Sequence, residues 1–146
     1  MSLNRAQFKD LIERVLGELD PKFNSPAAVN LLLGTAAQES FFGKYIRQIR
    51  GPALGVFQIE PETFKWLKQK YKGEYPILRS YTAKQLEWDL RAGIIFARLR
   101  YWVVPDPLPE PDDVEGLGEY WNDFYNANPH KGTVEEFKKR YEQFVT

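Results

Sequence analysis

Residues 26–43 read PAAVNLLLGTAAQESFFG and predict the helix on which the candidate site depends. Ser25, which a proline follows, is a favourable N-cap, and Gly43 is a natural left-handed residue at the other end. At about 100° per residue, one face of this helix collects Val29, Leu32, Leu33, Ala36, Ala37 and Ser40. Glu39 lies at the margin of that face, so we expect its carboxyl group to be half-buried near the helix end.

Glu39 is a candidate catalytic acid. Partial burial disfavours a charged carboxylate, and the negative end of the helix dipole disfavours it further. Both effects favour the protonated form near neutral pH, and a glycosidase uses such a carboxylic acid to protonate the leaving oxygen. An ordinary surface glutamate that faces water is the alternative that helix position alone leaves open.

The rest of the chain is predicted to be mainly helical. Apolar side chains recur at helical spacing over residues 8–19, and capping boxes or prolines mark the starts of other helices. The further helices are expected from Pro61 to Tyr71, from Thr82 towards Trp102, through Leu117 to Phe124, and from Thr133 through Phe144.

Two stretches are expected to be irregular. Residues 44–59 contain Gly51 and Gly55 and end in the β-favouring run VFQI, which predicts a small β-hairpin region near residues 50–60. Residues 103–113, VVPDPLPEPDD, predict a stiff surface loop, because proline fixes the backbone φ angle. The predicted fold class is therefore mainly α (α+β), in a single domain over residues 1–146.

Composition argues against several function classes. The 20 basic residues balance the 20 acidic ones, unlike the basic surface of a nucleic-acid binder. There is no cysteine, and His130 is the single histidine, so no metal and no other cofactor is expected. Charges interrupt the apolar residues at the N-terminus, and no apolar run approaches roughly 20 residues, so neither a signal peptide nor a membrane span is expected.

Three segments resemble the soluble lytic transglycosylases and the goose-type lysozymes, in the order in which that family has them. They are TAAQES at residues 35–40, GVFQIEPET at residues 55–63 and FYNANP at residues 124–129, with a weaker echo in WDLRAGIIFARLRYW at residues 88–102. The chain departs from the family at Asn128, where glycine is usual, and at Glu60, where an apolar residue is usual. The resemblance implies a lysozyme-like fold.

The resemblance also implies an activity. Glu39 would protonate the β-1,4 bond between N-acetylmuramic acid and N-acetylglucosamine in peptidoglycan, and would then accept a proton from the C6 hydroxyl, which leaves a 1,6-anhydro end. The substrate-binding residues would be Ser40, Gln58, Tyr125 and Asn126, with Tyr125 approaching the acid. From the residues themselves, the Gln58 amide suits an acetamido group, and the Ser40 hydroxyl lies beside the acid.

Several alternatives stay open. A lysozyme-type hydrolase would cleave the same bond with Glu60 or Glu62 as the second carboxylate. A non-catalytic lysozyme-fold module of a phage, or a glycan-binding domain, would keep the scaffold without turnover. A helical adaptor would bind another protein through exposed aromatic residues. An enzyme without a signal peptide would reach the cell wall as part of a phage virion or through a dedicated export machinery.

Overall fold

The computed structural model describes residues 2–126 and 131–146, and 63% of the described residues are helical. The α-helices in them are α1 (Arg5–Leu19), α2 (Pro26–Ser40), α3 (Pro61–Tyr71), α4 (Leu90–Trp102), α5 (Val114–Phe124) and α6 (Val134–Phe144). Short 3-10 helices cover Pro21–Phe23, Pro76–Ser80 and Ala83–Glu87. The mainly helical fold is thus confirmed, and none of the described helices has the length and apolar character of a membrane span.

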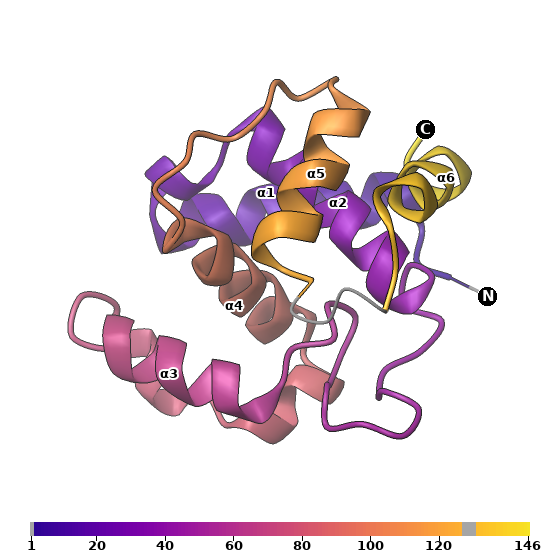
Figure 1. Cartoon of the computed structure of the whole chain (residues 1–146). Coiled ribbons are helices and arrows are strands. Elements are labelled where there is room, and N and C mark those ends of the chain that lie inside the picture. The colour runs from indigo at the N-terminus through magenta and orange to yellow at the C-terminus, as the bar shows by residue number, and fades with distance from the viewer. Residues whose placement is uncertain (1, 127–130) are drawn as a thin grey trace.

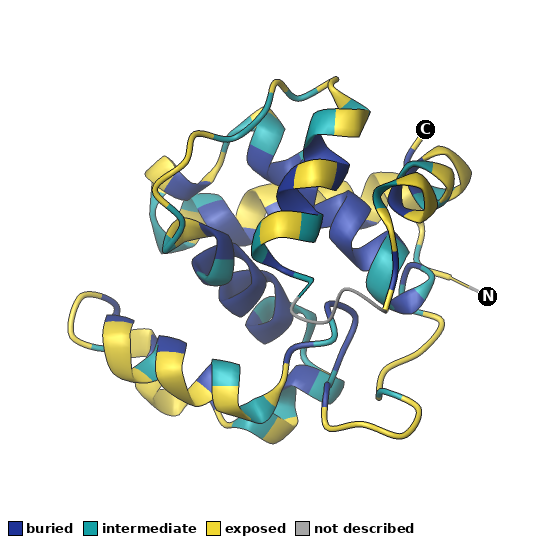
Figure 2. Ribbon diagram, viewed as in Figure 1, coloured by how far each residue is buried: buried dark blue, intermediate teal, exposed yellow. Residues whose placement is uncertain are grey.

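Helix α2 lies at the centre of the molecule (Figure 1). Its first turn is capped by Ser25, whose Oγ accepts a hydrogen bond of 3.1 Å from the backbone N–H of Ala28. Every residue from Leu31 to Ala37 is buried, and α2 packs against α1, α4, α5 and α6 (Figure 2). The end of α2 is therefore held from several sides.

Buried side chains from all six α-helices form one hydrophobic cluster. Helix α6 packs tightly on α2 at Gly34, where a Cβ atom would collide with the ring of Phe137. Phe137 is fully buried and stacks on Trp121 of α5, with 5.6 Å between the ring centroids. Burying one such large apolar side chain contributes roughly 1.5–3 kcal/mol, so the contact between α2, α5 and α6 is a major stabilising region.

Helix α2 ends at Ser40, three residues before the expected stop at Gly43. Phe41, Phe42 and Gly43 all have left-handed backbones, with φ angles of 52°, 58° and 87°. The reversal of the chain inserts the Phe42 ring into the core, edge-on to Phe8 with 5.4 Å between the centroids. Burial of this ring offsets the backbone strain, and α2 therefore ends earlier in the sequence than predicted.

The β-hairpin predicted near residues 50–60 is wrong. The described residues contain no strand there, only isolated bridges between Arg47 and Leu54 and between Leu54 and Ile59. Gly55 and Gln58 have φ angles of 82° and 50°, which are incompatible with an extended strand. The run VFQI is β-favouring in composition, but it forms a turn that buries its apolar side chains in the core.

The long helix predicted from Thr82 towards Trp102 is divided in two. The capping box of Thr82 and Gln85 is present, but it starts the 3-10 helix at residues 83–87. Helix α4 begins afresh after Asp89, whose side chain accepts a hydrogen bond of 3.1 Å from the backbone N–H of Ala92. An aspartate that binds the backbone in this way favours a new helix start over continuation of the previous helix.

The proline-rich stretch at residues 103–113 is irregular, as predicted. Two hydrogen bonds fasten it to the helices. Asn30 of α2 donates a bond of 2.8 Å to the carbonyl oxygen of Pro111, and the hydroxyl of Tyr120 donates one of 2.9 Å to the carbonyl oxygen of Asp106. This loop therefore connects α4 to α5 over the surface of the same helical body.

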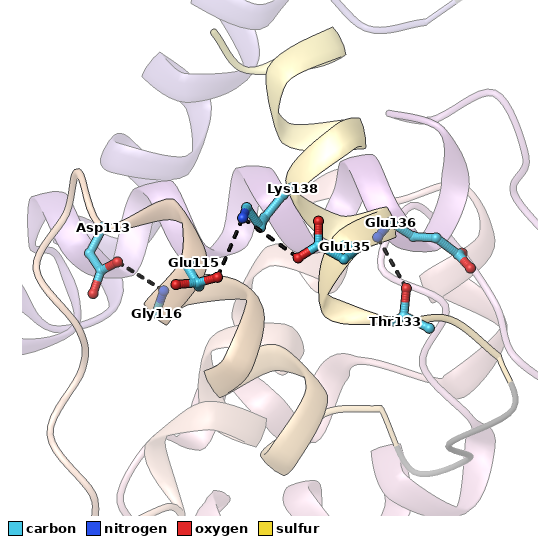
Figure 3. A network of polar contacts seen from close by, with 7 residues as sticks. All are labelled: Asp113, Glu115, Gly116, Thr133, Glu135, Glu136 and Lys138. Carbon is cyan, nitrogen blue, oxygen red and sulfur yellow. Dashed lines mark hydrogen bonds and ion pairs between the residues drawn. The ribbon is translucent and has the colours of Figure 1, made fainter.

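Helices α5 and α6 both begin with a side-chain cap (Figure 3). Asp113 accepts a hydrogen bond of 2.9 Å from the backbone N–H of Gly116 at the start of α5. Thr133 accepts one of 3.2 Å from the N–H of Glu136 at the start of α6, as its sequence position predicts. Each such cap contributes about 1 kcal/mol.

Lys138 links the same two helices on the surface. Its Nζ lies 3.4 Å from a carboxylate oxygen of Glu115 on α5 and 3.6 Å from one of Glu135 on α6 (Figure 3). Glu115 and Glu135 are exposed to solvent and Lys138 is partly exposed, so these ion pairs contribute less than about 1 kcal/mol each. The buried aromatic contact of Trp121 with Phe137 outweighs them in holding α5 on α6.

Candidate functional site

A cleft with a volume of about 450 Å³ opens at the end of α2. It is lined by Gln38 and Glu39 of α2, by several residues of the segment 41–60, by Thr63 of α3, by Arg100 of α4, by Tyr125 and Asn126 after α5, and by Lys131. Segments that are far apart in the sequence thus converge on the last turn of α2.

Glu39 is half-buried in this cleft, as its place on the helical wheel predicts. Its Oε2 accepts a hydrogen bond of 2.9 Å from the indole Nε1 of Trp121, which lies on α5. The indole ring is itself buried and stacked on Phe137. A rigid aromatic side chain therefore orients the carboxyl group.

The pKa of Glu39 is raised from its ordinary value of 4.5 to about 7. Burial is the main cause, because it disfavours the charged carboxylate. The hydrogen bond from Trp121 and the positive charges of Lys131 and Arg100 act in the opposite direction. Close to neutral pH, this group can therefore both give and take a proton.

Tyr125 lies in the wall of the cleft, but its hydroxyl is not bonded to Glu39. It donates a hydrogen bond of 2.6 Å to the carbonyl oxygen of Phe57, and burial raises its pKa above the ordinary tyrosine value. Its ring stacks on Tyr101 with 5.0 Å between the centroids. The hydroxyl bond fixes the turn at residues 55–58, while Tyr125 lies close enough to Glu39 for that carboxylate's charge to raise its pKa as well.

Gln58 and Asn126 both line the cleft, so the structure brings these two sequence-predicted residues near Glu39. The Gln58 side-chain amide donates a bond of 2.9 Å to the carbonyl oxygen of Gly55 within its own turn. The Asn126 amide donates bonds of 3.2 Å to the Asn122 side chain and to the carbonyl oxygen of Gly132. Both amides are therefore held in place by the protein.

Ser40 is the sequence-predicted residue that the structure does not bring into the cleft. It is fully buried. Its hydroxyl donates a hydrogen bond of 3.0 Å to the carbonyl oxygen of Ala36 and accepts one of 2.9 Å from the backbone N–H of Gly43. Both interactions close the end of α2. The geometry gives Ser40 a role in supporting the Glu39 backbone rather than in contacting a sugar.

Sequence reasoning missed four residues that surround Glu39: Gln38, Arg100, Trp121 and Lys131. Trp121 lies one helical turn before Tyr125, and this spacing from a motif residue is the signal that could have indicated it. Arg100 is one of three arginines in α4, with Arg91 and Arg98, so its residue type alone does not distinguish it in the sequence. Gln38 neighbours the acid, and its Oε1 is buried without a hydrogen-bond partner among the described residues.

The charged side chains that line the cleft are mostly basic. Arg47, Arg100 and Lys131 face the same space as Glu39 and Glu60, and the Glu60 side chain is exposed to solvent. Phe41 and Tyr45 add aromatic surface, whereas Trp66, an exposed ring of α3, lies outside the cleft lining. This mixture of amides, cations and rings suits a polar ligand with flat apolar faces.

Across residues 2–126 and 131–146, no cluster of three or more histidine, cysteine or acidic side chains forms a metal site. His130 and the departure at Asn128 lie outside the described residues. The departure at Glu60 places a charged group at the cleft wall, directly before α3.

No protein-family model, curated protein or solved structure matches the chain. The chemistry of the cleft and the resemblance of the three sequence segments are therefore the two grounds for a functional proposal.

Proposed function

We propose that this protein cleaves peptidoglycan glycan strands at the β-1,4 bond between N-acetylmuramic acid and N-acetylglucosamine. The observation that carries the proposal is Glu39, a cleft carboxyl group with a pKa of about 7 and a fixed orientation. A general acid works best when its pKa lies near the working pH. The helical scaffold around it is, in this proposal, lysozyme-like.

The proposed reaction is that of a lytic transglycosylase. Glu39 donates its proton to the glycosidic oxygen as the bond to C1 breaks, and the substrate's acetamido carbonyl stabilises the electron-poor carbon. The Glu39 carboxylate then takes the proton of the C6 hydroxyl, whose oxygen bonds to C1 and forms the 1,6-anhydro end. This sequence requires one carboxyl group, and Glu39 is the only half-buried carboxyl group among the described cleft residues.

The cleft lining supports a sugar substrate. The amides of Gln38, Gln58 and Asn126 offer donors and acceptors for hydroxyl and acetamido groups, and Tyr45 offers a ring for stacking. The basic side chains fit a glycan that carries carboxylates, as N-acetylmuramic acid does. Glu60 is the second carboxylate that a hydrolase of the same bond would use as its base.

The test is incubation of the purified protein with peptidoglycan, followed by mass spectrometry of the released fragments. Anhydro ends are expected, and reducing ends, heavier by one water, would assign a hydrolase instead. Glu39→Gln should lower the rate about 100-fold or more, because the amide cannot donate an acidic proton. Glu62→Gln, an exposed α3 residue outside the cleft lining, is the matched control and should keep the full rate.

Two results would overturn the proposal. Full activity of Glu39→Gln would remove the assigned acid. Binding to peptidoglycan without any release of fragments would favour the non-catalytic glycan-binding module. If the products carry reducing ends and Glu60→Gln is inactive, the protein is a hydrolase that uses Glu60 as its second carboxylate.

A further inference from the structure

Arg100 joins three elements of the cleft through one guanidinium group. Its Nη1 donates a hydrogen bond of 3.2 Å to the Thr63 hydroxyl in the first turn of α3, and its Nη2 donates one of 2.8 Å to the carbonyl oxygen of Tyr125. The guanidinium carbon also lies 4.7 Å from the centroid of the Tyr125 ring. Arg100 itself belongs to the last turn of α4.

The bond to the Tyr125 carbonyl fixes the chain where it leaves α5. Carbonyl groups in the last turn of a helix have no partner within that helix, and a cationic donor satisfies one of them here. The next residue, Asn126, lines the cleft. Arg100 is therefore bonded to the chain immediately before a residue of the cleft wall.

Arg100 is also one of two cations that act on Glu39. Lys131 is the other, and Trp121 adds its indole N–H from α5. Tyr101 and Tyr125 face the same group, and their phenols stay neutral because burial raises their pKa values. Lys131 is exposed to solvent, whereas Arg100 is half-buried and permanently charged, so its field is less screened.

We propose that Arg100 is a positioning residue that fixes the α3 and α5 walls of the cleft and adds a permanent positive charge to the cleft that Glu39 lines. The part that concerns turnover rests on the proposed glycan cleavage. The part that concerns the charge on Glu39 does not depend on any substrate.

Arg98 provides a matched control on the same helix. Its Nε donates a hydrogen bond of 2.9 Å to the carbonyl oxygen of Phe23, and its guanidinium carbon lies 5.6 Å from the Phe23 ring centroid. It thus combines a backbone carbonyl with an aromatic ring, as Arg100 does, but it is not part of the cleft lining. Arg98→Met and Arg100→Met each remove a guanidinium group that bonds a backbone carbonyl and lies near an aromatic ring, but only Arg100→Met removes it from the cleft.

The experiment is an NMR titration of the Glu39 carboxyl group in isotope-labelled protein, with Glu39→Gln used to assign the signal. Arg100→Met should raise the pKa of Glu39 by about half a pH unit, because a favourable charge has been removed. Arg98→Met should leave that titration unchanged, although it lowers thermal stability. Arg100→Lys should restore the titration, because the charge returns.

Measurements of turnover distinguish the positioning role of Arg100 from its electrostatic role. Arg100→Lys should keep the wild-type pH profile of kcat/KM but lower kcat, since the compact ammonium lacks the planar fork with which Nη1 and Nη2 bond Thr63 and the Tyr125 carbonyl separately. If Arg100→Met fails to fold, the comparison of the pH profile with kcat in Arg100→Lys is the deciding measurement. A wild-type kcat in Arg100→Lys would overturn the positioning role.

An unchanged Glu39 titration in Arg100→Met, or the same shift in Arg98→Met, would overturn the electrostatic role. If the titration shifts as expected while the wild-type protein releases no fragments from peptidoglycan, the proposed function fails and the effect of Arg100 on Glu39 stands.

Discussion

The indole N–H of Trp121 points at the carboxyl group of Glu39, with 2.9 Å between Nε1 and Oε2. This contact joins the last turn of α2 to α5, and it favours the charged carboxylate that burial disfavours. The two opposing effects leave the group close to half-ionised at neutral pH. Trp121 therefore lowers the pKa of Glu39 as well as holding its carboxyl group in place.

Trp121→Phe should make the activity persist to higher pH. Loss of the hydrogen bond raises the pKa of Glu39 further, by about one pH unit, so the acid stays protonated over a wider range. The alkaline limb of the pH profile of kcat/KM should move upward, while kcat falls because the carboxyl group has lost its orientation. A limb that moves to lower pH would contradict this role.

Stability should depend on pH through Glu39. Its carboxyl group releases its proton near pH 4.5 when unfolded but near pH 7 when folded, so the folded state binds the extra proton between these values. The contribution of this group to the free energy of unfolding therefore falls as pH rises from 4.5 to about 7, by at most about 3 kcal/mol. Chemical denaturation of wild type and Glu39→Gln across this range should show that, as pH rises, the free energy of unfolding of the variant increases relative to that of wild type. Parallel curves would contradict the raised pKa.

Tyr125→Phe should lower both stability and activity. The variant leaves the Phe57 carbonyl oxygen without its donor, at a cost of about 1–3 kcal/mol, and loosens the turn that carries Gln58. Thermal melts and fragment release measure the two effects. Tyr120→Phe is the control, because its hydroxyl also donates to a carbonyl oxygen, that of Asp106, but away from the cleft. Equal loss of activity in both variants would argue against a specific role of Tyr125.

Gly34→Ala should destabilise the protein by about 1–3 kcal/mol. A Cβ atom there would collide with Phe137 and lie 2.9 Å from Cδ2 of Tyr141, so α6 would have to move away from α2. Gly73→Ala is the control, because nothing lies within 4 Å of the added atom. Thermal unfolding of the two variants makes the comparison, and equal melting temperatures would contradict the close contact between these helices.

Helix positions were predictable because their signals are local. Ser25, Pro61 and Thr133 mark helix starts that the structure places where the sequence predicts them. The errors arose where distant contacts override local preference. The end of α2 depends on burial of Phe42 against Phe8, which no local pattern records. The run VFQI has strand composition, yet its apolar side chains are buried in a turn.

The candidate acid was predictable from its place on one helix, but its surroundings were not. The wheel position of Glu39 predicted partial burial, and the segments around Gln58 and Asn126 were correctly expected to meet it in space. The partners Trp121 and Arg100 come from α5 and α4, and their approach depends on how whole helices pack. Pairwise contacts of that kind leave no periodic signal in one sequence.

In the described part of the chain, every non-glycine residue with a left-handed backbone lies between α2 and α3: Phe41, Phe42, Arg50 and Gln58. Such conformations cost about 1–3 kcal/mol each, and this segment lines the cleft. Directed evolution for heat resistance alone would therefore select asparagine or glycine at Arg50 and Gln58, but not at Phe42, whose buried ring offsets its strain. The resulting thermostable descendants would have a less rigid cleft lining, and if the protein cleaves glycans as proposed, gains in melting temperature would be accompanied by losses in turnover.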